Sequence, residues 1–242
     1  LRAVAVTLVV LSHTGISIFH GGFVGVDMFF VISGYVIGLT LIREQLSTGK
    51  VSILHFLQRR FFRIYPPLAL MVVGASFYAY FILPFDKSQD YFIQQARAAL
   101  LSYGNFFYMF QKVDYFLTNP NLTFFLHTWS LGVEEQFYLL IPVLIYLVSK
   151  VFRKSGEHSA LKGWNALFIA IFLISVLSCI TLWTGRLNWV SGEFQSLMLF
   201  YSPLSRAREF LMGILIAINR SRRIQRGSNF LLYQGIFFVA LA

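Results

Sequence analysis

Charge is scarce in this sequence, and acidic charge is the scarcest. Charged residues make up 12% of the 242 residues, with ten Asp and Glu against twenty Lys and Arg, whereas ordinary soluble domains carry about 25%. Cysteine occurs once, at Cys179, which excludes an internal disulfide and a cysteine-based metal site. No set of His, Cys, Asp and Glu has metal-ligand spacing, so we expect no metal, and the chain has no internal repeat.

Apolar residues dominate instead. They form 57% of the chain, and long stretches without Asp, Glu, Lys or Arg recur, among them 3–18, 64–85, 163–185 and 227–242. Uninterrupted apolar runs of about 18 residues or more are typical of transmembrane helices. The sequence therefore predicts an all-α, polytopic transmembrane helix bundle. We expect one integral-membrane domain over residues 1–242 and no soluble domain.

The net charge of +10 could indicate a nucleic-acid ligand, but the positions of the basic residues favour a membrane explanation. Most of them lie in three clusters between apolar stretches, at 43–63, 150–162 and 220–226. Short basic loops mark the cytoplasmic side of membrane proteins. We therefore expect no nucleic-acid partner and place these three loops on the cytoplasmic side.

The apolar pattern predicts about seven or eight spans. The expected helices cover about 2–19, 24–42, 62–84, 124–149, 162–185 and 194–219, with a further helix from about 228. The segment 91–110 begins and ends on the outer side, so it cannot cross once. Its polar residues suit a re-entrant or interfacial segment, or one that lines a wet cavity.

The first expected helix carries two unusual polar side chains, Arg2 at its start and His13 inside it. Eleven residues at about 100° each turn through roughly 1100°, so both side chains share one face, about 16 Å apart along the axis. We expect the cation at the membrane surface and the imidazole deep in the bilayer. Ionisable groups in such places are costly and mark functional sites.

Polar residues in the next two helices have structural as well as functional explanations. Asp27 opens the second helix, where its carboxylate would cap the N-terminus. Ser33 belongs to a Ser-Gly pair midway along that helix, which favours close packing. Arg60 and Arg63 share a face at the cytoplasmic foot of the third helix. They suit a phosphate-rich ligand, or topology and lipid head groups, equally well.

The densest polar motif covers residues 127–138. A 3-4-4 spacing places four of its polar side chains on one helical stripe: His127, Ser130, Glu134 and Tyr138. Glu134 is costly within a membrane segment unless it is paired or faces water. It either orients His13 as a catalytic carboxylate would, or pairs with an arginine for structural reasons.

Arg206 and Glu209 lie three residues apart in the helix expected at 194–219. Side chains at this spacing meet on a helix surface, so they can form an ion pair within one helix. We favour a structural role for this pair.

Several motifs together resemble the membrane-bound acyltransferase-3 family. They follow one another over essentially the whole chain: the Arg-x10-His pattern of Arg2 and His13, the stretch GGFVGVDMFFVISG at 21–34, Arg60-x-x-Arg63, the stretch WSLGVEEQFY at 129–138, and Arg206-x-x-Glu209-Phe210-x-x-Gly213. The version here is most similar to the bacterial O-antigen and peptidoglycan O-acetyltransferases.

The resemblance implies a multi-pass enzyme of the bacterial cytoplasmic (inner) membrane. Such an enzyme moves an acyl group, usually acetyl, from cytoplasmic acyl-CoA to a hydroxyl of a glycan, such as a polysaccharide or a lipopolysaccharide. By the motif match, His13 is the catalytic histidine, and Arg2, Arg60 and Arg63 belong to the donor side. Family members carry additional helices, so we expect this domain to be truncated at both ends.

These assignments suggest a route for the donor. Its phosphates would lie on the arginines, and its thioester would extend along the helix face to His13, which acts as general base on the acceptor hydroxyl. Trp129, Ser130 and Tyr138 are unranked candidates for stabilising the oxyanion. The expected partners are membrane lipid, acyl-CoA and a glycan acceptor. A membrane transporter or flippase for a polar or lipid-linked substrate is the alternative, because it would also keep Arg, His and Glu within its helices.

Overall fold

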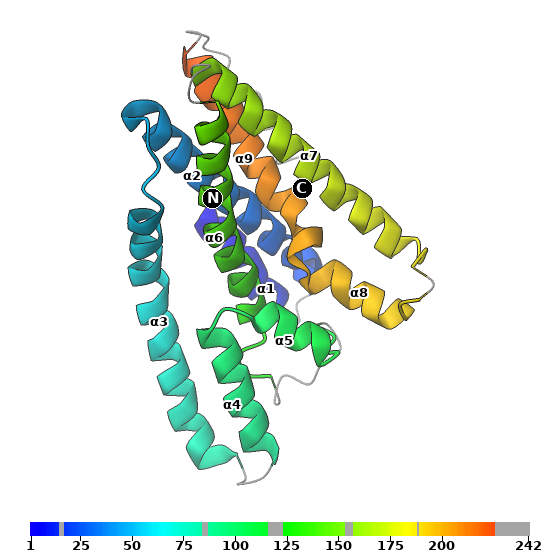
Figure 1. The fold of residues 1–242 in the computed structure, drawn as a ribbon. Helices are drawn as coiled ribbons and strands as arrows, with labels where there is room; N and C mark the ends of the chain where they lie inside the picture. The colour runs from blue at the N-terminus through cyan, green and yellow to red at the C-terminus, as the bar shows by residue number, and fades with distance from the viewer. Residues whose placement is uncertain (15–16, 84–86, 116–122, 153–156, 188, 226–242) are drawn as a thin grey trace. The chain divides into compact units, whose positions relative to one another are not determined.

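The structure, a computed structural model, describes residues 1–14, 17–83, 87–115, 123–152, 157–187 and 189–225. Over these residues it is helical and contains no strand (Figure 1). The elements follow in order: α1 (Arg2–Ser12), η1 (Ser17–Phe23), α2 (Val24–Thr48), α3 (Ile53–Ile82), α4 (Lys87–Leu100), α5 (Gly104–Phe110), α6 (Thr128–Val151), α7 (Glu157–Trp183), α8 (Gly192–Tyr201) and α9 (Pro203–Gln225).

Four stretches of the described chain are long and apolar enough to cross a membrane, which confirms the all-α membrane class. They are 21–48, 53–82, 128–151 and 159–183. The total of seven or eight spans is not shown. The helix expected over 2–19 ends at Ser12, and the one expected over 194–219 is divided between α8 and α9. The helix expected from 228 lies outside the described residues.

Two compact units make up the chain, and each is described by itself. Unit 1 comprises Leu1–Val51, Pro142–Val176 and Ala207–Ala242, and unit 2 comprises Ser52–Ile141 and Leu177–Arg206. Unit 1 therefore holds α1, η1 and α2 with parts of α6, α7 and α9, whereas α3, α4, α5 and α8 belong to unit 2.

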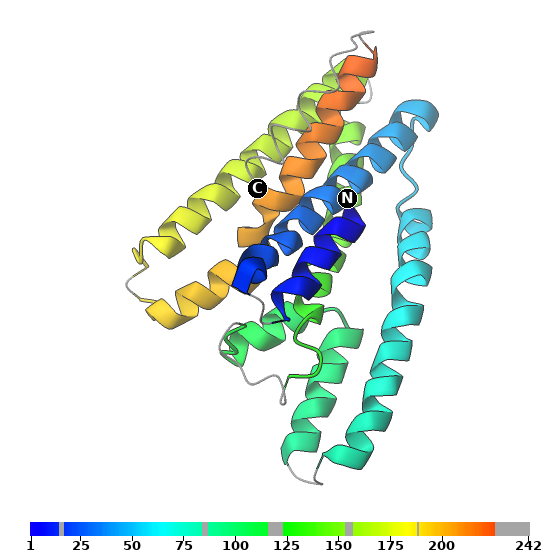
Figure 2. The ribbon, with the colours of Figure 1, turned by 180° about the vertical axis from the view of Figure 1, so that it is seen from behind.

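Glycine residues bring α1 and α2 of unit 1 together as antiparallel neighbours (Figure 2). A Cβ added at Gly25 of α2 would overlap the carbonyl oxygen of Ala5, and one added at Gly22, in η1 just before α2, would overlap that of Leu8. The two backbones therefore touch at these positions. Small residues that permit such an approach are typical of helix contacts in membranes.

A second close contact joins α2 to α9 in unit 1. A Cβ added at Gly34 would overlap the carbonyl oxygen of Phe210, and one added at Gly213 would overlap that of Val31. The Ser-Gly pair that predicted close packing is thus confirmed at Gly34. This contact fixes the middle of α2, which carries Ser33.

The segment predicted not to cross, 91–110, forms parts of two short helices in unit 2. With 14 and 7 residues, α4 and α5 extend about 21 and 10 Å, well short of a hydrocarbon core of about 30 Å. Two of its polar side chains are buried and bonded. Gln95 accepts from the Tyr108 hydroxyl at 3.2 Å, and Gln136 donates to Asn105 at 2.9 Å. These bonds serve the internal packing of unit 2.

The α2–α9 contact generates a stability prediction. Gly34→Ala and Gly213→Ala force backbone atoms apart, and overpacking of this kind costs about 1–3 kcal/mol. We expect each variant to lower the thermal unfolding midpoint of the purified protein in detergent. Gly74→Ala in α3 is the matched control, because nothing lies within 4 Å of its added Cβ. A midpoint for Gly34→Ala equal to that of Gly74→Ala would contradict the close contact.

Candidate functional site

Arg2 is anchored against the middle of α2. Its Nη2 donates a 3.1 Å hydrogen bond to the hydroxyl of Ser33, and its guanidinium carbon lies 5.3 Å from the centre of the Phe29 ring. Its Nε is buried and has no hydrogen-bond partner among the described residues. The structure thus brings two of the predicted site residues together and leaves one donor of the guanidinium unsatisfied.

This contact places Arg2 farther from the first basic cluster than the sequence suggested. Ser33 is the tenth residue of α2, and ten further residues, about 15 Å of helix, separate it from Arg43 in the first basic cluster. Arg2 is thus level with the middle of α2 and not with the end of α2 that leads to the first basic cluster, whereas its position relative to the membrane stays a prediction. An arginine midway along a candidate span is costly, and such residues mark substrate or ion sites.

His13 lies at the end of α1 rather than inside a longer helix. The helix ends at Ser12, and His13 is its C-terminal cap residue, with an exposed side chain. The hydroxyls of Ser12 and Thr14 each donate a 2.7 Å bond to a backbone carbonyl of the last turn. Because such local bonds compete with helix continuation, they give a physical reason for the early end.

The imidazole of His13 is oriented by its own helix. Its Nδ1 lies 2.8 Å from the carbonyl oxygen of Val9. A carbonyl can only accept, so Nδ1 carries the proton in this bond, and in the neutral ring Nε2 holds the lone pair. The eleven-residue spacing from Arg2 is maintained, about 16 Å along the axis.

Asp27 does not cap α2. The N-terminal cap residue is Phe23, and it makes no side-chain capping bond. Asp27 lies in the first turn, where the helix dipole still favours a carboxylate. The capping interpretation is corrected to this weaker electrostatic one.

Glu134, Tyr138 and Arg60 form a connected group within unit 2. The Tyr138 hydroxyl donates to Oε1 of Glu134, and both side chains are buried. The guanidinium carbon of Arg60 lies 5.0 Å from the centre of the Tyr138 ring and 5.4 Å from that of Phe56. A cation over two aromatic faces is attracted to both rings. Arg63, by contrast, is exposed.

The structure describes His13 in unit 1 and Glu134 in unit 2, so their proposed pairing stays a prediction. Within unit 2, Glu134 has a different contact, because it accepts the hydrogen bond of the Tyr138 hydroxyl. It fixes the hydroxyl of the ring on which Arg60 lies. The polar stripe is also shorter than expected, since α6 begins at Thr128 and His127 precedes it.

Glu135 is a polar residue that lies outside the predicted 3-4-4 stripe of α6. Its Oε1 is buried without a hydrogen-bond partner among the described residues, and its carboxyl is close enough to Arg60 to interact electrostatically. Its position next to Glu134 is the sequence feature that could have identified Glu135 as a candidate. The 3-4-4 stripe includes Glu134 and not Glu135, whereas Arg60 lies near enough to act on Glu135 as well.

The three candidates for oxyanion stabilisation are all engaged elsewhere. Tyr138 donates to Glu134, the Ser130 hydroxyl donates to the His127 carbonyl at 3.2 Å, and Trp129 is 2% exposed. The guanidinium of Arg206 lies 5.4 Å from the Trp129 ring centre and its Nε donates to the Phe200 carbonyl at 2.8 Å. These contacts favour a supporting role for all three residues.

Glu209 forms an ion pair of 2.7 Å with its neighbour Arg208. The pairing of Glu209 with Arg206 stays a prediction. Among the residues that the structure describes, no group of three or more His, Cys, Asp or Glu is placed to hold a metal ion.

The Glu134–Tyr138 bond generates a second prediction. Tyr138→Phe removes one hydroxyl and keeps the ring beneath Arg60, so a buried carboxyl loses its donor, which costs about 1–3 kcal/mol. We expect a lower thermal midpoint than for Tyr78→Phe, which changes an exposed tyrosine of α3. Equal midpoints would show that the hydroxyl contributes nothing to the folded state.

Comparison with known proteins gives a consistent result. A family model described as an acyltransferase domain matches residues 1–242. The chain is 30% identical over 220 residues to the O-acetyltransferase OatA of Staphylococcus aureus (strain NCTC 8325 / PS 47), covering 90% of this chain and 33% of that protein. It is 34% identical over 217 residues to the peptidoglycan O-acetyltransferase OatA of Listeria monocytogenes serovar 1/2a, covering 90% and 32%.

The chain therefore spans about a third of the length of these relatives. No solved structure matches it.

Proposed function

Since the chain belongs to the acyltransferase-3 family and is an acyltransferase of the membrane, we propose that it transfers an acetyl group from cytoplasmic acyl-CoA to a hydroxyl of a cell-surface glycan. Its relatives are named O-acetyltransferases, which supports acetyl and an oxygen acceptor. The name of the Listeria relative includes peptidoglycan, which makes a cell-wall glycan a reasonable acceptor class. We place the protein in the bacterial cytoplasmic membrane, because a cytoplasmic donor and a cell-surface acceptor lie on opposite sides of that membrane.

The orientation of His13 is the observation that carries this proposal. The Val9 carbonyl holds the proton on Nδ1, so Nε2 has the lone pair that a general base needs. In the proposed reaction Nε2 takes the proton of the acceptor hydroxyl while the hydroxyl oxygen attacks the thioester carbon. The tetrahedral intermediate then expels the thiolate of CoA, which receives the proton from the imidazolium.

Arg2 fits the other end of the donor arm. The pantetheine arm between the sulfur and the diphosphate has roughly 13 bonds and extends about 16 Å at the advance per bond of an extended chain. This length matches the spacing of about 16 Å between His13 and Arg2 along α1. An acyl-CoA with its thioester at His13 would thus bring its diphosphate to the unsatisfied guanidinium of Arg2.

Arg60 and Arg63 serve the donor in different ways under this proposal. Arg60 is held on the Tyr138 and Phe56 rings, so it offers a fixed cation, and Glu134 acts on it through Tyr138. Arg63 is exposed and offers a cation that faces outward from α3. We therefore propose Glu134 as a positioning residue for Arg60, in addition to its proposed action on His13.

Transfer of label tests the proposal. Membranes that carry the full-length protein receive labelled acetyl-CoA, and label on glycan is followed for the wild type and His13→Ala. Because general-base catalysis contributes about 10²–10⁴-fold, we expect at least a hundredfold loss of transfer with donor binding retained. The matched control is His55→Ala, which changes an exposed histidine of α3.

Two outcomes would contradict the proposal. Transfer by His13→Ala at the rate of His55→Ala would remove the general-base role. Absence of label in the wild type, with movement of unmodified substrate across the membrane, would favour a transporter or flippase instead.

A further inference from the structure

All three basic clusters of the sequence contribute to one end of unit 1. Lys50 follows the end of α2, Lys150 lies in the last turn of α6, and Arg222 lies near the end of α9. Arg222 donates a 2.9 Å bond to the carbonyl of Leu161 at the start of α7. The ends of α2, α6 and α9 and the start of α7 lie together there (Figure 1). Because short basic segments mark the cytoplasmic side of membrane proteins, we expect this end to be the cytoplasmic one.

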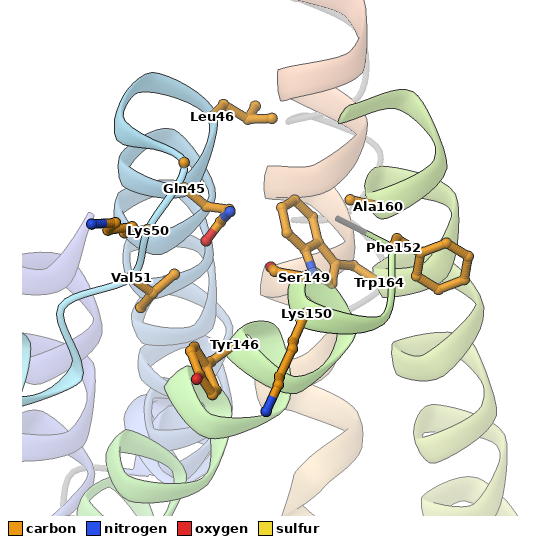
Figure 3. Close-up of a pocket in the computed structure, with 11 residues that line it drawn as sticks. Gln45, Leu46, Lys50, Val51, Tyr146, Ser149, Lys150, Phe152, Ala160 and Trp164 are labelled. Carbon is orange, nitrogen blue, oxygen red and sulfur yellow. The ribbon is translucent and has the colours of Figure 1, made fainter. Parts of the chain in front are cut away.

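A pocket of about 660 Å³ opens at this end, entirely within unit 1. It lies between the end of α2, the end of α6 and the start of α7, and the eleven residues that line it include two lysines, Lys50 and Lys150. Figure 3 shows Gln45 and Ser149 facing each other across it, with Lys150 at its edge and the side chain of Lys50 extending away from these residues. The volume is in the range of small-molecule sites.

The walls of the pocket are fixed by hydrogen bonds. Trp164 is fully buried and donates to the Ile145 carbonyl at 3.2 Å, and Ser149 donates to the same carbonyl at 2.6 Å. On the opposite side Gly49 ends α2 with a φ of +69°, and the Thr48 hydroxyl bonds the backbone of Lys50 at 2.9 Å. The pocket is therefore a built feature, and the position of the Lys50 backbone is determined.

The charge of the pocket is not balanced. Of the described residues that line it, none is acidic, and neither lysine forms an ion pair within the described part of the chain. Positive charge beside a concave site attracts an anion, and a lysine, with its flexible four-carbon side chain, is a point-charge donor for phosphate. Gln45 and Ser149 supply polar groups inside the same pocket.

We propose that this pocket binds a phosphate-bearing group through Lys50 and Lys150. Two sources share that chemistry. One is the nucleotide end of acyl-CoA, which rests on the proposed function, and the other is the head group of an anionic phospholipid of the cytoplasmic leaflet.

Binding measurements that do not require acyl transfer test the proposal. The full-length protein is placed in nanodiscs, and the double variant Lys50→Gln, Lys150→Gln is compared with Lys162→Gln, which changes an exposed lysine of α7 outside the pocket. The arginine variants Lys50→Arg, Lys150→Arg keep the charge and guard against a folding defect. CoA and 3′-dephospho-CoA are titrated in phosphatidylcholine discs, and retained phosphatidylglycerol is measured by native mass spectrometry.

If the pocket binds the nucleotide, we expect the glutamine variants to weaken CoA binding by about tenfold per lysine. Binding of 3′-dephospho-CoA should change little, and the arginine variants should bind CoA as the wild type does. If it takes lipid, CoA binding is unchanged and retained phosphatidylglycerol falls by a similar factor. Either result supports a phosphate site. Equal CoA affinity and equal lipid retention in the double variant and Lys162→Gln would overturn it and leave both lysines with a topological role alone. Because no acceptor is present, a failure of the His13 proposal leaves this result unaffected.

Discussion

The hydrogen bond between Arg2 and Ser33 is the constraint on which this account depends. It ties the start of α1 to the middle of α2, a helix long and apolar enough to cross a membrane. Glycine contacts between the two helices set their distance, and the Gly34 contact with α9 fixes the level of Ser33. A guanidinium with a buried, unpartnered Nε is thereby held where a bilayer would otherwise exclude it.

Much of the chemistry follows from the helix that carries this arginine. One α-helix, 11 residues long, separates Arg2 from His13, so a guanidinium and an imidazole lie about 16 Å apart on one rigid element. The same helix orients the imidazole through the Val9 carbonyl. A thioester donor with a phosphate-bearing end needs both groups at such a separation. In unit 2, Arg60 is held by aromatic rings and, through Tyr138, by Glu134.

The spacing of side chains in the sequence could predict which polar residues share a helix. It could not predict which backbone carbonyl a side chain would contact, or at what level two helices would meet. The close packing of α2 at Gly34 and the failure of 91–110 to form one spanning helix follow from residue types and helical periodicity. The Val9 carbonyl, however, is a backbone group with no side-chain signal. The depth of Arg2 depends on where α1 meets α2, which is decided by tertiary packing. Glu135 lies outside the predicted stripe, because side-chain spacing describes one helix, whereas its neighbour Arg60 comes from another.

The most direct test is an experimental structure of the full-length protein in nanodiscs with a non-hydrolysable acetyl-CoA analogue. The account predicts the carbonyl carbon of the acetyl group within about 4 Å of Nε2 of His13, since reacting groups must approach closely. It also predicts the diphosphate in contact with Arg2, which keeps its bond to Ser33. An analogue bound away from both residues, with the imidazole of His13 packed against lipid, would contradict it.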